Sequence, residues 1–204
     1  MRVQFWFEFA STYSYPAAMR VEHEAARCGM AIEWKPFLLG PIFAAQGWND
    51  SPFNLYPAKG RYMWRDLERI CETQGLPFHR PSQFPRSGLL AARVASAAEG
   101  ERWLPEFVRA VYQANFAYDR DITDRAVISE VLQDLELPAR VWLERAESAD
   151  VKARLRARTE EAQRCGIFGA PSFLVSNELF WGNDRLECAL DWAKRSTAAP
   201  PLRA

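Results

Sequence analysis

The sequence predicts an α/β protein in which strands from both ends of the chain enclose a long helical middle. Three observations support this fold class. The first residues alternate between apolar and polar side chains, as in a half-buried strand, and a helical pattern and a second strand follow. The middle of the chain has helical periodicity, interrupted by segments rich in Pro and Gly. The end of the chain returns to short strands and a terminal helix.

The N-terminal segment is predicted to be a strand–helix–strand unit. Residues 3–9 alternate, with four apolar side chains on one face. Residues 15–28 have a helical pattern that ends at Gly29. Residues 31–37 are the second strand. Two strands joined by one helix over this length of chain predict a parallel unit with a right-handed connection.

The middle of the chain is predicted to be helical after an initial loop. Residues 40–57 contain several Pro, Gly and Asn residues, which predict a long loop with one short helix, and such loops are often functional. Helices are then predicted at residues 58–74, from a Ser87 cap to Glu99, at 102–117, from a Thr123 cap to Leu135, after Pro138 and at 149–165.

The C-terminal segment predicts a hairpin followed by a helix. A strand after Pro171, a tight turn at Asn177-Glu178 and a second strand at residues 179–181 form the hairpin. Asn183 or Asp184 can cap the terminal helix. The residues of this helix that we expect to face inward are Leu186, Leu190 and Trp192.

This order of elements is that of a thioredoxin-like core interrupted by a large all-helical insertion domain. We expect residues 1–40 and 155–204 to form a discontinuous thioredoxin-like domain, and residues 41–154 to form the helical insertion domain. Two independent domains in series are less favoured, because neither end segment holds a complete core.

Composition restricts the classes of partner. Among 204 residues, 26 Lys plus Arg balance 26 Asp plus Glu, so nucleic acid is not expected as a partner. No apolar run or leader-like pattern predicts a membrane segment, and we expect a soluble, cytoplasmic protein. The spacing of the two His residues predicts no metal site. The cysteines, which form no Cys-x-x-Cys motif, are expected to be small buried hydrophobes: Cys28, Cys71, Cys165 and Cys188.

The turn between the first strand and the first helix carries the strongest functional signal. It contains Ser11-Thr-Tyr-Ser, where thioredoxin-like proteins that oxidise or reduce thiols have Cys-x-x-Cys. A hydroxyl group near a helix N-terminus can hydrogen-bond a thiolate that another molecule supplies, but it cannot form a disulfide. The alternative interpretation is that Ser11 is a plain N-cap of the helix.

Three motifs occur in order along the chain: Ser11-Thr-Tyr-Ser-Tyr, Phe168-Gly-Ala-Pro-Ser-Phe and Trp181-Gly-Asn-Asp-Arg. Together with the order of elements they resemble the 2-hydroxychromene-2-carboxylate isomerases and the related kappa-class glutathione transferases, which belong to the DsbA-like group of thioredoxin folds. The resemblance spans nearly the whole chain. Thr12 stands where the family has Pro, which predicts a looser turn, and Glu8 stands where Asp is common.

The resemblance implies glutathione as the cofactor. Ser11 is then the catalytic residue, whose hydroxyl donates a hydrogen bond to the glutathione sulfur and favours the thiolate. A cis Ala170-Pro171 bond would expose backbone groups to the tripeptide; the alternative is a trans proline at the start of a strand. The γ-glutamyl end would meet the terminal helix, with Asp184 taking the ammonium group and backbone N–H groups the carboxylate. The implied glutathione-binding residues are Ala170, Pro171, Trp181, Gly182, Asn183 and Asp184.

The resemblance also implies a site for a small aromatic substrate in the loop after residue 40. Asn54 matches a family position that contacts the organic substrate, whereas Phe43 and Leu55 stand where basic residues occur. Lys59 can compensate for that loss or lie on a solvated helix face, and Asn49 is either a contact or a turn residue. The expected substrate-binding residues are Phe43, Asn49, Asn54 and Lys59.

We therefore expect a glutathione-dependent cis–trans isomerase, a homodimer, that acts on an aromatic hydroxychromene-carboxylate-like substrate in the catabolism of aromatic compounds. One alternative is a kappa-class-like glutathione transferase or peroxidase. A thiol–disulfide oxidoreductase is disfavoured, because residues 10–15 contain no cysteine. A third alternative is a non-catalytic relative that binds glutathione.

Overall fold

The computed structural model describes residues 2–198, which are built around a four-stranded sheet with the strand order β2-β1-β3-β4. β1 pairs in parallel with β2 and antiparallel with β3, and β3 and β4 form an antiparallel hairpin. The sheet is therefore assembled from both ends of the chain, as the sequence predicts. The strands are β1 (Arg2–Phe7), β2 (Ala31–Pro36), β3 (Ser172–Val175) and β4 (Glu178–Trp181).

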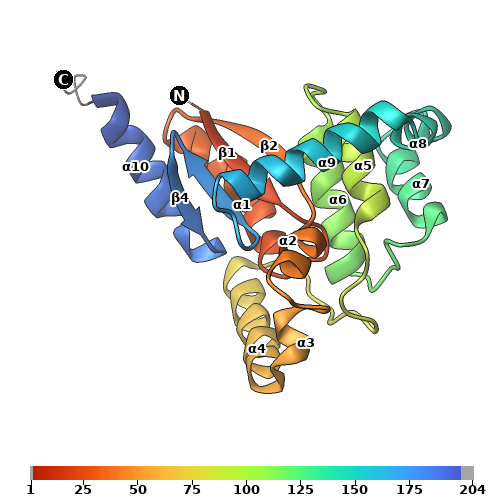
Figure 1. The fold of residues 1–204 in the computed structure, drawn as a ribbon, viewed down its shortest axis with the longest axis horizontal. Helices are drawn as coiled ribbons and strands as arrows, with labels where there is room; N and C mark the ends of the chain where they lie inside the picture. Colours follow the sequence, from red (N-terminus) through yellow and green to blue (C-terminus); the bar gives the residue numbers. More distant parts are fainter. Residues whose placement is uncertain (1, 199–204) are drawn as a thin grey trace.

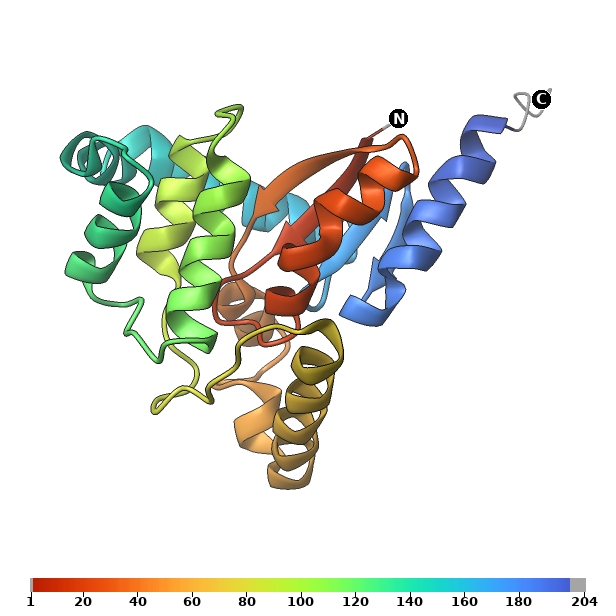
Figure 2. The same ribbon diagram turned by 180° about the vertical axis from the view of Figure 1, so that it is seen from behind.

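Helices cover both faces of the sheet (Figures 1 and 2). On one face, α1 (Ser14–Arg27) and α10 (Leu186–Ala198) pack over buried side chains that include Phe5 and Phe173. On the other face, Trp6 packs with residues of α2 (Leu39–Ala45) and α9 (Ala149–Arg164). The alternation of side chains along β1 thus supplies apolar groups to two separate layers.

Aromatic packing joins the strands from the two ends of the chain. The ring of Phe5 lies 5.4 Å from that of Phe173 and 5.1 Å from that of Trp34, and these residues occupy paired positions of neighbouring strands. Cross-strand aromatic pairs of this kind stabilise a sheet beyond the burial of their area.

Between β2 and β3, the described chain contains helices and connecting loops. In the two views, α3 and α4 project together below the sheet, whereas α5 to α8 gather beside it (Figures 1 and 2). One buried apolar cluster continues from β1 and α1 into these helices. The remaining helices of this part are α3 (Pro52–Leu55), α4 (Pro57–Gln74), α5 (Leu89–Ala97), α6 (Leu104–Phe116), α7 (Arg125–Asp134) and α8 (Ala139–Ala146).

The structure confirms the order of elements, and the domain boundaries at residues 41 and 154 stay predictions. α9 crosses the second boundary and contacts both β2 and α5. None of the helices in the described part of the chain is both long and apolar enough to cross a lipid bilayer.

Several local predictions are corrected by the structure. Residues 40–57 form two short helices rather than one. Asp124 rather than Thr123 caps α7, because its carboxylate accepts the N–H of Ala126 at 2.8 Å. The hairpin turn lies at residues 176–177, one position earlier than predicted, where Ser176 adopts a positive φ of 57°.

Two expectations about burial near the C-terminus were also wrong. Trp192 is 42% exposed rather than turned inward, although Leu186 and Leu190 are buried as predicted. Cys71 is buried, but Cys188 is exposed.

Neither of the two residues predicted to cap the terminal helix, Asn183 and Asp184, does so. Both lie in a short 3-10 helix (η1, Asn183–Arg185) that precedes α10, and η1 itself begins without a side-chain cap.

Candidate active site

Ser11 lies in the turn that connects β1 to α1, and backbone hydrogen bonds hold this turn. The N–H of Ser11 donates to the carbonyl of Glu8 at 3.0 Å. Thr12 is buried, and its hydroxyl donates to the sulfur of Met63 in α4 at 3.1 Å. The residue that replaces the family's proline is therefore tied to the helical part of the chain, a constraint that the sequence pattern did not reveal.

The hydroxyl of Ser11 faces the second predicted motif. The Ala170–Pro171 bond is cis, as predicted, and Ser11 Oγ donates a hydrogen bond of 2.8 Å to the carbonyl oxygen of Ala170, 159 positions away in the sequence. The N–H of Gly182 donates to the carbonyl of Pro171 at 2.9 Å, which ties this loop to the third motif. The three motifs therefore meet at one place.

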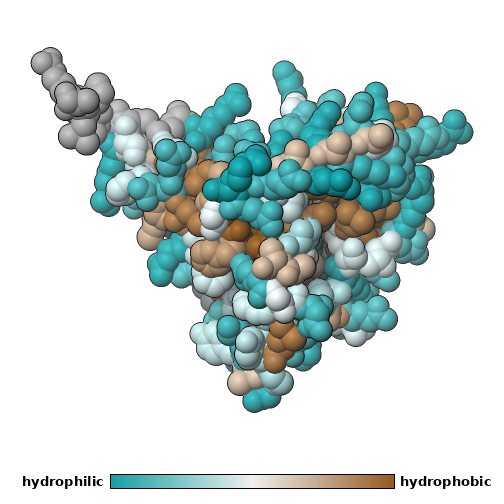
Figure 3. Space-filling model, in the orientation of Figure 1, coloured by the Kyte–Doolittle hydropathy of each residue, from teal (hydrophilic) through white to brown (hydrophobic). Residues whose placement is uncertain are grey.

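A cavity of about 970 Å³ opens beside this contact. Its walls come from the turn after β1, from α2 to α4, from the segment before α5 and from the loops on either side of the β3–β4 hairpin. Figure 3 shows apolar side chains gathered near the middle of one face of the molecule, around α2. The aromatic residues of the wall are Tyr13, Phe43, Trp48, Phe53, Phe84, Phe168 and Trp181.

Most of the predicted site residues lie on this wall, and two do not. Asn54 is exposed, and its amide N–H₂ group donates to the Asp50 carboxylate at 3.1 Å and to the Phe84 carbonyl at 3.3 Å. Pro171 is buried and does not line the cavity. The predicted residues that line the cavity are Ser11, Phe43, Asn49, Lys59, Ala170, Trp181, Gly182, Asn183 and Asp184. Their roles in binding stay predictions.

Two glycines permit the close approach of backbone and side chains at this end of the cavity. Gly182 has a φ of 117°, and a Cβ atom there would lie 2.5 Å from Asp184 Oδ1. A Cβ atom at Gly169 would lie 2.3 Å from the indole nitrogen of Trp181. The positive φ at position 182 and the indole ring beside position 169 therefore favour glycine at both positions.

Glu8 is a buried carboxyl group on the cavity wall, and sequence motifs predict no functional role for it. It is 7% exposed, and its Oε2 accepts the N–H of Ala10 at 3.0 Å. Burial raises the pKa of the Glu8 carboxyl to about 8, and the hydrogen bond from Ala10 opposes this effect. The site therefore holds a protonated acid at neutral pH, beside the turn that carries Ser11.

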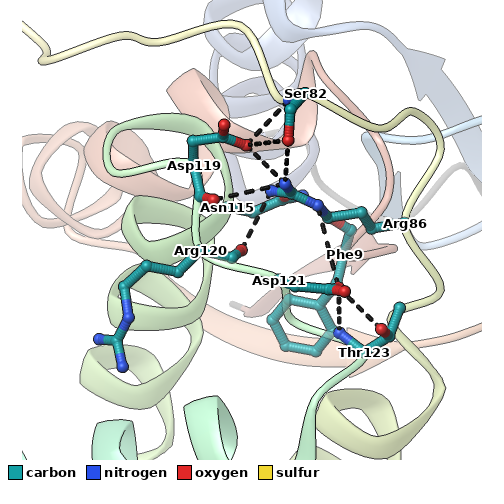
Figure 4. Close-up of polar contacts among 8 residues, drawn as sticks. All are labelled: Phe9, Ser82, Arg86, Asn115, Asp119, Arg120, Asp121 and Thr123. Atoms are coloured by element: carbon teal, nitrogen blue, oxygen red, sulfur yellow. Dashed lines mark hydrogen bonds and ion pairs between the residues drawn. The ribbon is translucent and has the colours of Figure 1, made fainter.

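Arg86 is the second buried ionisable group on the wall, and both of its terminal nitrogens donate hydrogen bonds, whereas its Nε lies 3.9 Å from Asp121 (Figure 4). It forms an ion pair of 2.5 Å with Asp119, and it donates to the Asn115 amide oxygen at 3.2 Å and to the Arg120 carbonyl at 3.1 Å. Hydrogen bonds from Ser82 and Arg86 hold the pKa of Asp119 below its usual range. Arg86 thus anchors the segment before α5, and its buried Nε–H has no hydrogen-bond partner among the described residues. No sequence motif marks it.

Sequence comparisons with known proteins identify the family of the chain. The sequence model of the DSBA-like thioredoxin domain matches residues 2–191. The chain is 34% identical over 188 residues to a 2-hydroxychromene-2-carboxylate isomerase of Sphingobium xenophagum, covering 91% of this chain and 94% of that protein. It is 26% identical to glutathione S-transferase kappa 2 of Caenorhabditis elegans, over 97% of this chain and 94% of that protein.

A solved structure supports the same assignment. The structure of a 2-hydroxychromene-2-carboxylate isomerase superposes with a TM-score of 0.85 at 25% identity, covering 97% of this chain and 98% of the other. The predicted family and fold are therefore confirmed. The chain belongs to the DsbA-like thioredoxin family, in the group that contains the 2-hydroxychromene-2-carboxylate isomerases and the kappa-class glutathione transferases.

Proposed function

We propose that this protein is a glutathione-dependent cis–trans isomerase of an aromatic substrate that resembles 2-hydroxychromene-2-carboxylate. The observation that carries the proposal is the 2.8 Å contact between the Ser11 hydroxyl and the carbonyl that precedes the cis proline, at the wall of a large cavity. Ser11 replaces a redox-active cysteine, so the site suits binding of an external thiol without disulfide exchange.

The polar groups on the wall fit glutathione. The carbonyl of Ala170 is an acceptor suited to the N–H of an extended peptide, and the Ser11 hydroxyl is a donor suited to a thiolate. Farther along the same wall, Asn183 and Asp184 offer an amide and a carboxylate to the charged γ-glutamyl end. When bound, glutathione supplies a nucleophilic sulfur that adds reversibly to an enone, so that the former double bond can rotate.

The residues of the chain orient and stabilise the reacting groups. Ser11 Oγ turns its proton from the Ala170 carbonyl to the sulfur, and the released carbonyl accepts a peptide N–H instead. A charge-assisted hydrogen bond of this kind, together with the nearby N-terminus of α1, lowers a thiol pKa by ~1–2 units from a free value of about 8.5. The aromatic wall excludes water from the second substrate, and Lys59 and Asn49 provide polar contacts at its rim.

The variant Ser11→Ala tests this proposal directly. It removes the hydroxyl that favours the thiolate, so we expect glutathione-dependent isomerisation of 2-hydroxychromene-2-carboxylate to fall about 100-fold. The reaction is followed by ultraviolet absorbance at saturating substrate. Ser196→Ala, an exposed serine of α10 whose hydroxyl bonds only within the helix, is the matched control. Full turnover by Ser11→Ala would overturn the assignment of Ser11.

A kappa-class-like transferase activity is the second candidate. The apolar side chains at Phe43 and Leu55, where basic residues are common in the isomerases, and the similarity to the transferase of Caenorhabditis elegans favour it. Formation of a glutathione conjugate from chlorodinitrobenzene, with no turnover of the chromene carboxylate, would identify the transferase. The homodimer and the cytoplasmic location stay predictions, and light scattering of the purified protein tests the first.

A further inference from the structure

Asn183 is held from behind by an arginine of α1. It is 7% exposed and lies in η1, on the wall of the cavity. Arg20 Nε donates to the side-chain oxygen of Asn183 at 3.3 Å, and Arg20 Nη2 donates to its backbone carbonyl at 2.5 Å. The same guanidinium group forms an ion pair with Glu187 of α10. Arg20 therefore joins the first helix of the chain to the region where the last helix begins.

These contacts decide which way the Asn183 amide points. An Asn side chain has one acceptor oxygen and one N–H₂ donor, and an arginine can pair only with the oxygen. A flipped amide would place its donor against the Arg20 Nε donor and lose that hydrogen bond, whereas the contact between Arg20 and the Asn183 backbone carbonyl would remain. The hydrogen bonds found within residues 2–198 include one to the Asn183 side-chain oxygen and none donated by its N–H₂ group. The amide is thus a donor with a free N–H₂ group.

We infer that Arg20 is a positioning residue that fixes Asn183 as a hydrogen-bond donor and thereby makes this end of the cavity select a carboxylate. The inference rests on the proposed function, in which the ligand is glutathione, and it identifies the α-carboxylate of the γ-glutamyl group as the partner of the Asn183 side chain. Asp184, whose side chain is 73% exposed, forms an exposed ion pair with Arg185 at 3.5 Å that the neighbouring ammonium group of the ligand can replace.

The test compares two ligands. One is glutathione, and the other is its analogue in which the γ-glutamyl α-carboxylate is a carboxamide. The unaltered protein should bind glutathione about tenfold more tightly than the analogue in titration calorimetry, since the carboxamide pairs less well with a donor. Arg20→Met keeps the length of the side chain but frees the amide to flip, and we expect the two ligands to bind it with nearly equal affinity. We expect Arg20→Met to keep its turnover at saturating glutathione and to have a higher KM for glutathione.

Asn183→Asp provides a second variant that keeps the contact with Arg20. One carboxylate oxygen still accepts from Arg20, but the other presents an oxygen where the N–H₂ group stood. The preference should therefore reverse, with the carboxamide analogue binding more tightly than glutathione. This result does not depend on whether Arg20→Met retains its full stability.

Two control variants separate positioning from general destabilisation. Glu187→Gln weakens the ion pair but leaves both contacts between Arg20 and Asn183 in place. Arg27→Met removes another ion pair of α1, between the exposed Arg27 and Glu24, neither of which lines the cavity. Both should keep the tenfold preference. An unchanged preference in Arg20→Met overturns the positioning role of Arg20, and an unchanged preference in Asn183→Asp overturns the pairing of the Asn183 side chain with the carboxylate; the proposed function stands in both cases. Failure of the unaltered protein to bind either ligand overturns the proposed function itself.

Discussion

At the scale of single residues, the site depends on buried polar groups that are each held by named partners. Ser11 is only 9% exposed, and its hydroxyl is satisfied by the Ala170 carbonyl in this structure. A buried hydroxyl without a partner would be costly, so the carbonyl keeps Ser11 facing the cavity until a ligand replaces it. The same principle applies to Glu8 and Arg86, whose environments lead to two predictions.

Glu8 should make the stability of the protein depend on pH. Its pKa rises from the ordinary 4.5 to about 8 on folding, so between these values the folded state holds a proton that the unfolded state has released. The stabilisation from this proton is fully present below about pH 4 and is lost as the pH rises through about 8, at up to about 1.4 kcal/mol per pH unit. Glu8→Gln should remove this pH-dependent loss. The free energy of unfolding of the variant should therefore increase relative to that of the unaltered protein as the pH rises.

Urea denaturation across that pH range measures the effect. A control is Glu106→Gln on α6, which changes an exposed carboxylate outside the cavity. If the difference between the Glu8→Gln and unaltered proteins stays constant with pH, the carboxyl group of Glu8 is ionised in the folded state and the argument fails.

Arg86→Met should destabilise the protein by about 3 kcal/mol, because it leaves the Asn115 amide oxygen and two backbone carbonyls without their buried donor. Thermal and urea denaturation measure the loss. Arg65→Met removes an exposed ion pair with Glu68 and should leave stability close to that of the unaltered protein. Equal stability of the two variants would show that the hydrogen bonds of Arg86 do not contribute to the stability of the fold.

At the scale of elements, the connections between strands and helices place the functional groups. The short turn after β1 brings Ser11 to the cavity, and the β3–β4 hairpin ends in the bend at Gly182. Alternation and helical periodicity were sufficient to find all of the strands and the long helices. They could not distinguish Thr123 from Asp124 as the cap of α7, since both residue types cap helices and only the local backbone decides between them.

Gly182→Ala should weaken glutathione binding more than it weakens the fold. A Cβ atom at this position strains a positive φ, and it would lie 2.5 Å from the tip of the Asp184 side chain, which must then turn aside. We expect at least about a tenfold loss of affinity in calorimetry, equivalent to about 1.4 kcal/mol. Gly75→Ala is a matched control: Gly75 also has a positive φ, at the end of α4, but a Cβ atom there meets open space.

The control should lose about 1 kcal/mol of stability and keep its affinity for glutathione. Binding that is unchanged in both variants would mean that the bend at Gly182 does not take part in recognition.

At the scale of the whole molecule, the cavity exists because the two ends of the chain fold together and the helical middle closes it. Contacts with Arg20 and Ser11 connect segments more than 150 positions apart. A ligand that bridges these segments should order them together. Hydrogen exchange with saturating glutathione should therefore slow in residues 8–15 and in residues 168–184 at the same time.

Mass spectrometry of peptides from the two segments measures this exchange, and peptides of α7 and α8, which lie beside the sheet and away from the cavity lining, serve as the internal control. Protection of one segment alone would contradict a ligand that spans both ends of the chain.

The sequence by itself determined the order of strands and helices, the serine in place of a redox cysteine and the family resemblance, because these features depend on local periodicity and short motifs. Tertiary structure decided which residues share the cavity: it placed Asn54 outside the wall, tied Thr12 to Met63, buried Glu8 and Arg86, and set Arg20 behind Asn183. Those contacts join residues that are distant along the chain. Their geometry follows from how the helices pack on the sheet, which no local pattern encodes.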